Sequence, residues 1–180
     1  RQVAQFNDMT REVMAFARGE RRVLARKVYL DKFVGSVSEV LKPEFEGVDV
    51  KFVVKNDAKN TGHFDEGKML RVVTNIARNA RQALKGDGSF TWTLSDTDDG
   101  GLIFRLEDDG PGIPESIRDT LFDAFTTSGK PEGTGLGLAI VRRVVEDHGG
   151  SVSFTTKTDV GTSFIVRLPG APDDASSEAG

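Results

Sequence analysis

Two asparagines on one predicted helix could hold a hard cation. Residues 65–84 carry apolar side chains at a 3.6-residue period, which predicts an amphipathic helix. Asn75 and Asn79 are four residues apart, so they share another face of this helix with Arg71. Amide oxygens are suitable ligands for Mg²⁺, which also keeps several of its waters. The pattern indicates a magnesium site, but a solvated helix face that tolerates Asn would give the same pattern.

A turn rich in glycine and proline directly follows a predicted strand. It reads Glu107-Asp108-Asp109-Gly110-Pro111-Gly112-Ile113-Pro114. Asp108, at the end of the strand, can accept a hydrogen bond from a ring amine. Gly110 and Gly112 leave room for a flat base beside the backbone. The alternative interpretation is a tight turn built from residues that favour turns.

Glycines also precede and open the helix predicted over residues 136–146. Gly133, Gly135 and Gly137 lie around its start, where free backbone N–H groups and the positive end of the helix dipole attract phosphate. The spacing matches neither the nucleoside-triphosphatase loop nor the dinucleotide-binding fingerprint. On its own, this segment is weak evidence for a phosphate site.

The remaining segments predict the scaffold that must position these residues. Helices are also expected over residues 1–18 and 31–41, the second capped by Asp31 and ended before Pro43. After it, residues 55–63 form a polar loop. Strands are expected over residues 26–30, 48–54, 90–94, 102–106, 152–156 and 163–168, of which the last four form two hairpins. The fold class is therefore α+β, a two-layer sandwich of a mixed, mainly antiparallel sheet of roughly five strands packed against helices on one face.

The composition excludes several classes of site. The 180 residues include 24 basic and 28 acidic side chains, giving a net charge of −4, so no basic excess exists for a nucleic-acid binder. The chain has no cysteine and only two histidines, His63 and His148, which excludes disulfides, thiol nucleophiles and Cys- or His-rich metal sites. The chain contains no run of about 18 apolar residues, which is the length needed to span a membrane. Because the chain does not begin with Met, we expect a fragment of a longer protein.

Taken in order, these motifs resemble a known family. The Asn-bearing helix, the Asp-x-Gly-x-Gly turn, Phe122 and Phe125, the Gly-Thr-Gly-Leu-Gly-Leu helix start and a final Gly161-Thr162 follow one another along the chain. This arrangement is similar to the ATP-binding catalytic domain of bacterial two-component sensor histidine kinases, closest to the nitrogen-regulation type. The wider superfamily includes DNA gyrase, Hsp90 and MutL. The resemblance covers about residues 27–169 and implies a Bergerat-type ATP-binding fold with ATP and Mg²⁺ as cofactors.

The resemblance also implies a role for individual residues. Asn79 matches the asparagine that holds Mg²⁺ in that family, and Asp108 matches the aspartate that accepts from the adenine amino group. Phe122 and Phe125 match the family's Phe-box. The other residues that match nucleotide-binding positions are Asn75, Gly110, Gly112, Ile113, Lys130, Gly133, Thr134, Gly135, Leu136, Gly137, Leu138 and Thr162.

The loop over residues 108–134 is too long for a plain connection, and we expect it to act as a closing lid. Its segment Thr126-Thr127-Ser128-Gly129-Lys130-Pro131 resembles the short lid of the nitrogen-regulation type, with two extra residues before the lysine. We expect residues 126–132 to be highly mobile without nucleotide. The small, polar residues 171–180 are predicted to be a disordered tail.

One position separates the enzyme classes within the superfamily. The gyrase- and Hsp90-like ATPases carry a general-base Glu four residues before the magnesium asparagine, whereas this chain has Asn75, whose amide cannot take a proton. The resemblance therefore favours a protein-histidine kinase that transfers the ATP γ-phosphate in line to a histidine. Two alternatives stay open: a slow ATPase or conformational switch of the gyrase and Hsp90 branch, and a degenerate regulatory module that binds nucleotide, or only a partner protein, without chemistry.

The expected phosphoacceptor is absent from this sequence. Residues 1–19 resemble the end of the second helix of the family's dimerisation hairpin, and residues 20–170 are expected to form the ATP-binding domain. Neither His148, at a helix end, nor His63, in the loop before Phe64, is expected to be the acceptor; both are assigned structural or surface positions, and Trp92 is assigned to the core. The implied partners are the chain's own dimerisation helices and a response regulator receiver domain. The full-length protein is expected to be a cytoplasmic homodimer, with or without a membrane anchor.

Overall fold

The structure is a computed structural model that describes residues 22–59, 61–127 and 134–171. Its helices are α2 (Leu30–Phe45), α3 (Glu66–Leu84), α4 (Glu115–Arg118) and α5 (Gly137–Asp147). Its strands are β1 (Arg26–Tyr29), β2 (Asp49–Asn56), β3 (Thr61–Phe64), β4 (Asp87–Asp96), β5 (Leu102–Asp108), β6 (Ser151–Lys157) and β7 (Gly161–Leu168). Within these ranges, no helix is long and apolar enough to cross a lipid bilayer.

Several expectations fall outside the described residues. They concern the helix over residues 1–18, Lys130, Gly133, most of the mobile lid segment and nearly all of the C-terminal tail.

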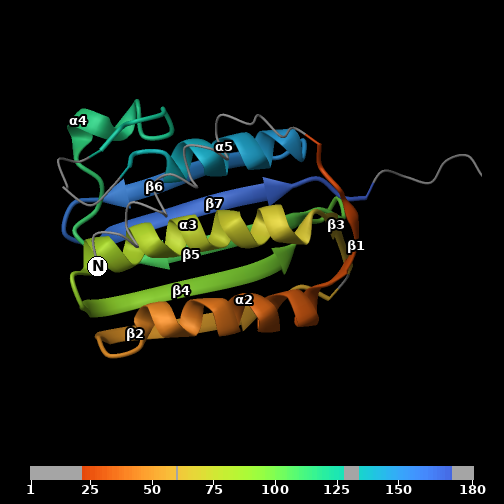
Figure 1. Ribbon diagram of the computed structural model, residues 1–180, viewed down its shortest axis with the longest axis horizontal. Coiled ribbons are helices and arrows are strands. Elements are labelled where there is room, and N and C mark those ends of the chain that lie inside the picture. Colours follow the sequence, from red (N-terminus) through yellow and green to blue (C-terminus); the bar gives the residue numbers. More distant parts are fainter. Residues whose placement is uncertain (1–21, 60, 128–133, 172–180) are drawn as a thin grey trace, which may run out of the picture.

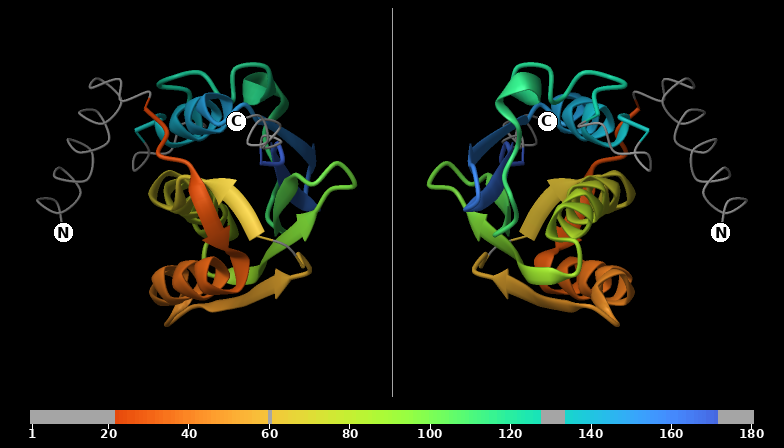
Figure 2. Two further views of the ribbon diagram at one scale, coloured as in Figure 1. Left: turned by 90° about the vertical axis from the view of Figure 1, so that its right-hand side faces the viewer. Right: turned by 90° about the vertical axis from the view of Figure 1, so that its left-hand side faces the viewer.

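Five strands form one twisted sheet in the order β2-β4-β5-β7-β6. The pair β2 and β4 is parallel, and the other three pairs are antiparallel. Helices α2, α3 and α5 form a second layer on one face of the sheet (Figures 1 and 2). The expected α+β sandwich with a mixed, mainly antiparallel sheet is confirmed. Strands β2 and β4 are parallel because α3, which lies between them in the sequence, returns the chain to the end of the sheet at which β2 begins.

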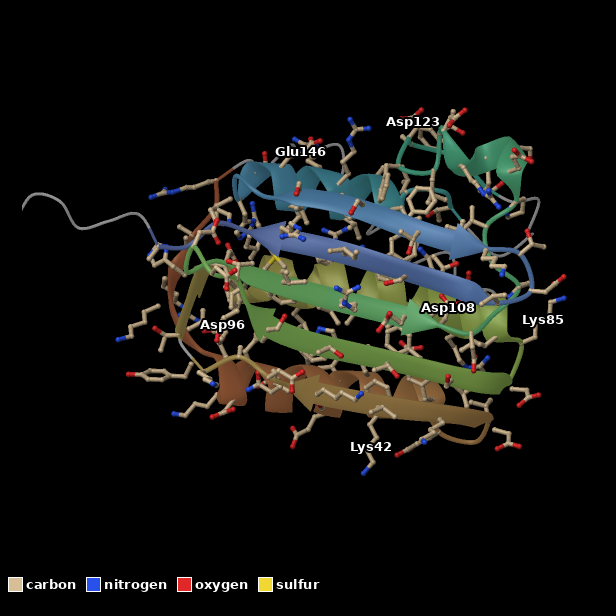
Figure 3. All side chains as sticks on the ribbon, turned by 180° about the vertical axis from the view of Figure 1, so that it is seen from behind. Lys42, Lys85, Asp96, Asp108, Asp123 and Glu146 are labelled. Carbon is tan, nitrogen blue, oxygen red and sulfur yellow. The ribbon has the colours of Figure 1, made fainter. Side chains whose placement is uncertain are left out.

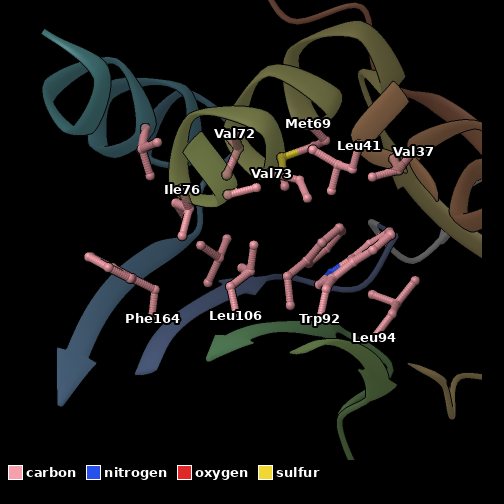
Figure 4. Packing of buried hydrophobic residues seen from close by; sticks show 14 of the residues in the cluster. Val37, Leu41, Met69, Val72, Val73, Ile76, Trp92, Leu94, Leu106 and Phe164 are labelled. Carbon is pink, nitrogen blue, oxygen red and sulfur yellow. The ribbon is translucent and has the colours of Figure 1, made fainter. Parts of the chain in front are cut away.

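The core lies between α3 and the middle of the sheet. Alternate residues of β4 and β5 point toward the helices, and Trp92, Phe104 and Leu106 are at most 1% exposed. They face a buried row on α3 that consists of Met69, Val72, Val73 and Ile76 (Figure 4). Trp92 packs edge-on to Phe33 of α2, with ring centroids 6.3 Å apart, so its assignment to the core is confirmed.

Helix α2 departs from the prediction at both ends. It begins at Leu30 with Tyr29 in the N-cap position and no side-chain cap, so the expected cap by Asp31 is wrong. It also continues through Pro43 to Phe45 instead of stopping before the proline. Phe45 is 5% exposed, and its ring stacks on Phe52 and Phe90 at 5.0 and 5.3 Å. Burial of this aromatic stack offsets the backbone hydrogen bond that the proline removes.

A second, two-stranded sheet lies beside the start of α3 (Figure 1) and was not predicted. Strands β1 and β3 pair in antiparallel register, and each buries one apolar side chain, Val28 and Phe64. The expected loop over residues 55–63 is therefore wrong in its last three residues, and it is also wrong in its first two, which belong to β2. A four-residue strand that contains glycine and histidine carries too weak a local pattern to be recognised. His63 lies on β3 and is exposed, which agrees with its expected surface position but not with a loop.

A hydrogen-bonded joint connects the start of α3 with the end of α5. Asp65 caps α3 by accepting the Lys68 N–H at 3.1 Å, and its other oxygen accepts the Leu24 N–H at 3.1 Å. The Asp65 N–H donates to His148 Nε2 at 3.1 Å, while His148 Nδ1 donates to the Val144 carbonyl at 2.7 Å. The joint thus holds both helices and the segment that leads into β1, and His148 has the structural position expected of it.

The Asp65 carboxylate contributes stability that depends on pH. Burial alone would raise the pKa of Asp65, but the N–H groups of Lys68 and Leu24 and the charge of Lys68 outweigh it and hold the pKa below its ordinary value. A carboxyl whose pKa is lowered on folding adds stability above its unfolded-state pKa. That stability is lost as the pH falls through the folded-state pKa.

We therefore expect Asp65→Asn to lower the free energy of unfolding at pH 7 by about 1 kcal/mol, because the amide can still cap α3 but lacks the charge and the second acceptor oxygen that bonds the Leu24 N–H. The difference from the wild type should shrink as the pH falls below 4. Urea denaturation followed by circular dichroism between pH 3 and 7 measures both effects. Asp57→Asn, which changes an exposed carboxylate in the loop after β2, is the control. A difference that is independent of pH would contradict this account.

Candidate functional site

The motif residues come together at one end of the sandwich. Asp108 ends β5, Thr162 is the second residue of β7, and the second half of α3 carries Asn75 and Asn79. Asp108 pairs directly with Thr162 in the β5–β7 register. Figure 3 shows Asp108 toward the end of the sheet where Lys85 closes α3. The sheet register therefore joins the Asp-x-Gly-x-Gly turn to the final Gly-Thr pair, which lies far from it in the sequence.

The two adjacent aspartates of the turn have different partners. Asp109 accepts the Ser89 N–H at 2.6 Å and the Ser89 hydroxyl at 2.7 Å. The Ser89 hydroxyl, followed by the Ser89 N–H, holds the pKa of Asp109 below its ordinary value. Asp108 lies on the helix-facing side of β5, half-buried, and accepts the Gly110 N–H at 3.0 Å. Asp109 therefore ties the turn to β4, while Asp108 is the carboxylate placed beside Thr162.

Both glycines of the turn have close contacts within the protein. A Cβ at Gly110 would lie 2.8 Å from Asp108 Oδ1. Gly112 has a φ of +77°, and a Cβ there would lie 2.7 Å from the Lys157 carbonyl oxygen of β6. The backbone contact and the positive φ give a structural reason for Gly112 that is independent of a bound base, whereas the contact at Gly110 is with the end of a side chain that can move.

A threonine that the sequence analysis did not single out connects three segments of the site. Thr156, near the end of β6, accepts the Ile113 N–H at 2.9 Å and donates to the Gly161 carbonyl at 3.1 Å. Its hydroxyl also lies 3.2 Å from that of Thr162, its partner in the β6–β7 register. The predicted hairpin could have revealed this pair, because the two threonines are equidistant from its turn. Since the Ile113 N–H is already bonded, the part of Ile113 left for a ligand is its side chain.

Gly161 allows β7 to approach the end of β5 closely. Its φ is +137°, a conformation that L residues rarely adopt, and a Cβ would lie 2.0 Å from the Asp108 carbonyl oxygen and 2.9 Å from Asp109 Cα. Both contacts are with backbone, which cannot move aside as a flexible side chain can. Gly161 is thus the residue that permits the Asp108–Thr162 pairing.

A backbone contact joins the two sides of the segment that is expected to form a lid. The Phe125 N–H donates to the Gly135 carbonyl at 2.9 Å. Gly135 has a φ of +67°, and a Cβ there would lie 2.6 Å from the Phe125 carbonyl carbon. Phe125 itself has a φ of 68° and is 70% exposed, whereas Phe122 packs against Phe154 and Phe164. The two Phe-box residues therefore differ, one being part of the core and the other exposed at the base of the lid.

Helix α5 begins at the glycine-rich segment, as predicted. Thr134 accepts the Leu136 N–H at 3.2 Å, and Leu136, 1% exposed, anchors the first turn. Gly137 lies against Asn75 of α3, whose side-chain amide donates to the Gly137 carbonyl at 3.4 Å. Asn75 is 8% exposed, so it connects the two helices in addition to any contact with a ligand. Leu138 follows on the first turn and is half-buried.

Asn79 lies one helical turn beyond Asn75 and is half-buried. Among the described residues, no group of three or more His, Asp or Glu side chains could hold a metal ion. A cation at this end of the molecule would therefore depend on an amide oxygen, on oxygens of a ligand and on water, which is a donor set that Mg²⁺ accepts.

A family model for the histidine kinase-, DNA gyrase B- and HSP90-like ATPases matches residues 64–172. The sensory histidine kinase/phosphatase NtrB of Rhodobacter capsulatus is 35% identical over 122 residues, which covers 61% of this chain and 34% of that protein. The chain thus spans about a third of the length of this relative.

Two solved structures share the fold. Full-length ShkA in complex with AMPPNP superposes with a TM-score of 0.83 at 26% identity, over 94% of this chain and 37% of that one. Histidine kinase ThkA in complex with the response regulator TrrA superposes with a TM-score of 0.78 at 21% identity, over 96% of this chain and 49% of that one.

The close approach at Gly161 leads to a prediction. Gly161→Ala should lower the free energy of unfolding by about 1–3 kcal/mol, because it adds a backbone clash to an unfavourable φ. Urea denaturation measures the change. Gly100→Ala is the matched control, since Gly100 also has a positive φ, +79°, but has open space around its Cβ position. Equal destabilisation by the two substitutions would show that the close contact with Asp108 does not contribute to the cost of Gly161→Ala.

Proposed function

Because the chain belongs to the histidine kinase-, DNA gyrase B- and HSP90-like ATPase family, we propose that residues 20–170 are the ATP-binding catalytic domain of a two-component sensor histidine kinase. The domain would transfer the ATP γ-phosphate to a histidine on a dimerisation helix. One observation carries the choice of a kinase over an ATPase: the position of the ATPases' general base is Asn75. Its amide cannot accept a proton, and in this structure it donates to the Gly137 carbonyl at 3.4 Å.

The adenine end of the nucleotide is assigned to the β5–β7 pair. Asp108 would accept from the adenine amino group, and Thr162 lies opposite it in the register. The side chain of Ile113, half-buried at the edge of the turn, would cover the base. Support comes from the separation of the two aspartates, because Asp109 is already bonded to Ser89 and Asp108 is the one aligned with Thr162.

The phosphates are assigned to the first turn of α5 and the residues before it. The free N–H groups of a helix start stabilise negative charge, and this start faces Asn75 of α3. Asn79, one turn away, would hold Mg²⁺ through its amide oxygen. When bound, the ion would neutralise charge on the triphosphate. Lys130 and Gly133 remain proposed phosphate contacts on the lid.

The chain's further assignments follow from the same family. We propose that residues 1–19 end a dimerisation hairpin and that the full-length protein is a cytoplasmic homodimer. The phosphoryl group would pass to a response regulator receiver domain. The ThkA structure contains a response regulator, which supports this class of partner. The NtrB relative, 35% identical, supports the nitrogen-regulation type.

The binding part of this proposal makes a sharp prediction. The wild type should bind ADP with Mg²⁺ in isothermal titration calorimetry, and Asp108→Asn should weaken binding by about tenfold or more, since a hydrogen bond to a charged group is lost. Asp109→Asn is the matched control. It should lower the free energy of unfolding through loss of the Ser89 bonds yet keep affinity within about threefold of the wild type. An unchanged affinity in Asp108→Asn would refute the assignment of the base.

Phosphoryl transfer is tested on a longer protein that includes the whole of the proposed dimerisation hairpin. After addition of γ-labelled ATP, the extended protein should acquire acid-labile, base-stable phosphate, whereas the 180 residues alone should bind ATP without becoming labelled. Asn79→Ala should reduce labelling about 10–100-fold through loss of the metal ligand. Steady ATP hydrolysis by the 180 residues, abolished by Asn79→Ala, would favour the slow ATPase instead. Absence of nucleotide binding would favour the degenerate module.

A further inference from the structure

We propose that Thr156 is a positioning residue for the nucleotide base, because it sets the direction in which the Thr162 hydroxyl points its proton. This inference rests on the proposed function and deepens it, since it explains how the site would distinguish a 6-amino purine from a 6-keto purine. Thr156 lies on β6, is half-buried, and contacts both the Gly-Ile turn after β5 and the start of β7.

The hydroxyl group of Thr156 can form only a limited number of hydrogen bonds. A threonine hydroxyl can donate one hydrogen bond and accept two. The Gly161 carbonyl oxygen can only accept, so the Thr156 proton is directed to it, at 3.1 Å. The Ile113 N–H can only donate, so it occupies one lone pair of Thr156, at 2.9 Å.

The remaining lone pair of the Thr156 hydroxyl is available to Thr162. Their hydroxyl oxygens are 3.2 Å apart, which is hydrogen-bond distance. Since the Thr156 proton is used by Gly161, the Thr162 hydroxyl must supply the proton of this bond. Thr162 is 6% exposed, so an unsatisfied hydroxyl there would be costly, and the bond to Thr156 satisfies it.

The bond between Thr156 and Thr162 determines which hydrogen bonds the site can form with a ligand. With its proton given to Thr156, Thr162 can offer only lone pairs to a ligand. Asp108, its partner in the β5–β7 register, offers only carboxylate oxygens. Both side chains at this edge therefore accept hydrogen bonds. A 6-amino group donates and fits them, whereas a 6-keto oxygen would meet two acceptors and remain unpaired.

Thr156 also fixes the backbone of the turn. The Ile113 N–H, 43 residues away in the sequence, has its acceptor in Thr156, and the Asp159 N–H donates to the Pro111 carbonyl at 3.0 Å. The turn after β5 is thus held to the β6–β7 hairpin at two points. Loss of the Thr156 hydroxyl would release one of them and free the Thr162 proton at the same time.

The test compares binding of ADP and inosine 5′-diphosphate, whose bases differ in the 6-substituent and in the proton that the 6-keto base carries on N1, by isothermal titration calorimetry with Mg²⁺. The wild type should prefer ADP. In Thr156→Val, affinity for ADP should fall about tenfold, and the ADP preference should shrink at least about threefold, because Thr162 can then donate to the 6-keto oxygen. Thr156→Ser keeps the hydroxyl and should restore both values. Thr155→Val, next along β6 with an exposed side chain on the opposite face, should leave both values unchanged.

Each outcome has a defined meaning. If the wild type bound neither nucleotide, the proposed function would fail. If it bound ADP and Thr156→Val kept the same preference, whatever its affinity, then Thr156 would be a structural residue only and this inference would be overturned. Hydrogen exchange of the wild type without nucleotide gives a test that needs no variant: the Ile113 amide should be protected, and free exchange would equally overturn the inference.

Discussion

The candidate site depends on the close pairing of β7 with the end of β5. Gly161 packs its backbone against that of Asp108, at a distance that leaves no space for a side chain. This contact aligns Thr162 with Asp108, and the next strand pair aligns Thr156 with Thr162. Because successive residues of a strand point to opposite faces, a shift of β7 by one residue against β5 would turn Thr162 away from the helices while Asp108 stayed in place. The register is therefore the constraint from which the polar edge of the site follows.

Two hydrogen-bonded contacts hold α3 and α5 in place above this edge. Near the site, Asn75 donates to the carbonyl of Gly137 at the first turn of α5. At the far end, the His148 ring connects the last turn of α5 to the backbone of Asp65 at the start of α3. Both ends of α5 are thus held to α3, which determines where Asn79 lies relative to the helix start assigned to the phosphates. Asp65 also accepts the Leu24 N–H, so the segment that leads into β1 is bonded to the same joint.

Strong local patterns predicted most of the fold, and weak ones failed. The period of α3 and the turns of the two hairpins are properties of neighbouring residues, so those elements were found with small errors at their ends. Strand β3 and the continuation of α2 through Pro43 depend on partners distant in the sequence. The first pairs with β1, and the second is stabilised by the stacking of Phe45 on Phe52 and Phe90. No local rule contains those contacts.

The order and chemistry of the motifs are properties of the sequence alone, and they were sufficient to indicate the family and the residues that could meet a nucleotide. The tertiary structure decided how neighbouring, chemically equivalent groups divide their roles. Of two consecutive aspartates, Asp109 bonds Ser89 and Asp108 is aligned with Thr162. Thr156 became a residue of the site only through its contacts with Ile113 and Gly161. The reason is physical: a side chain's type sets what it can donate or accept, but only the surrounding fold determines which of those bonds are already used.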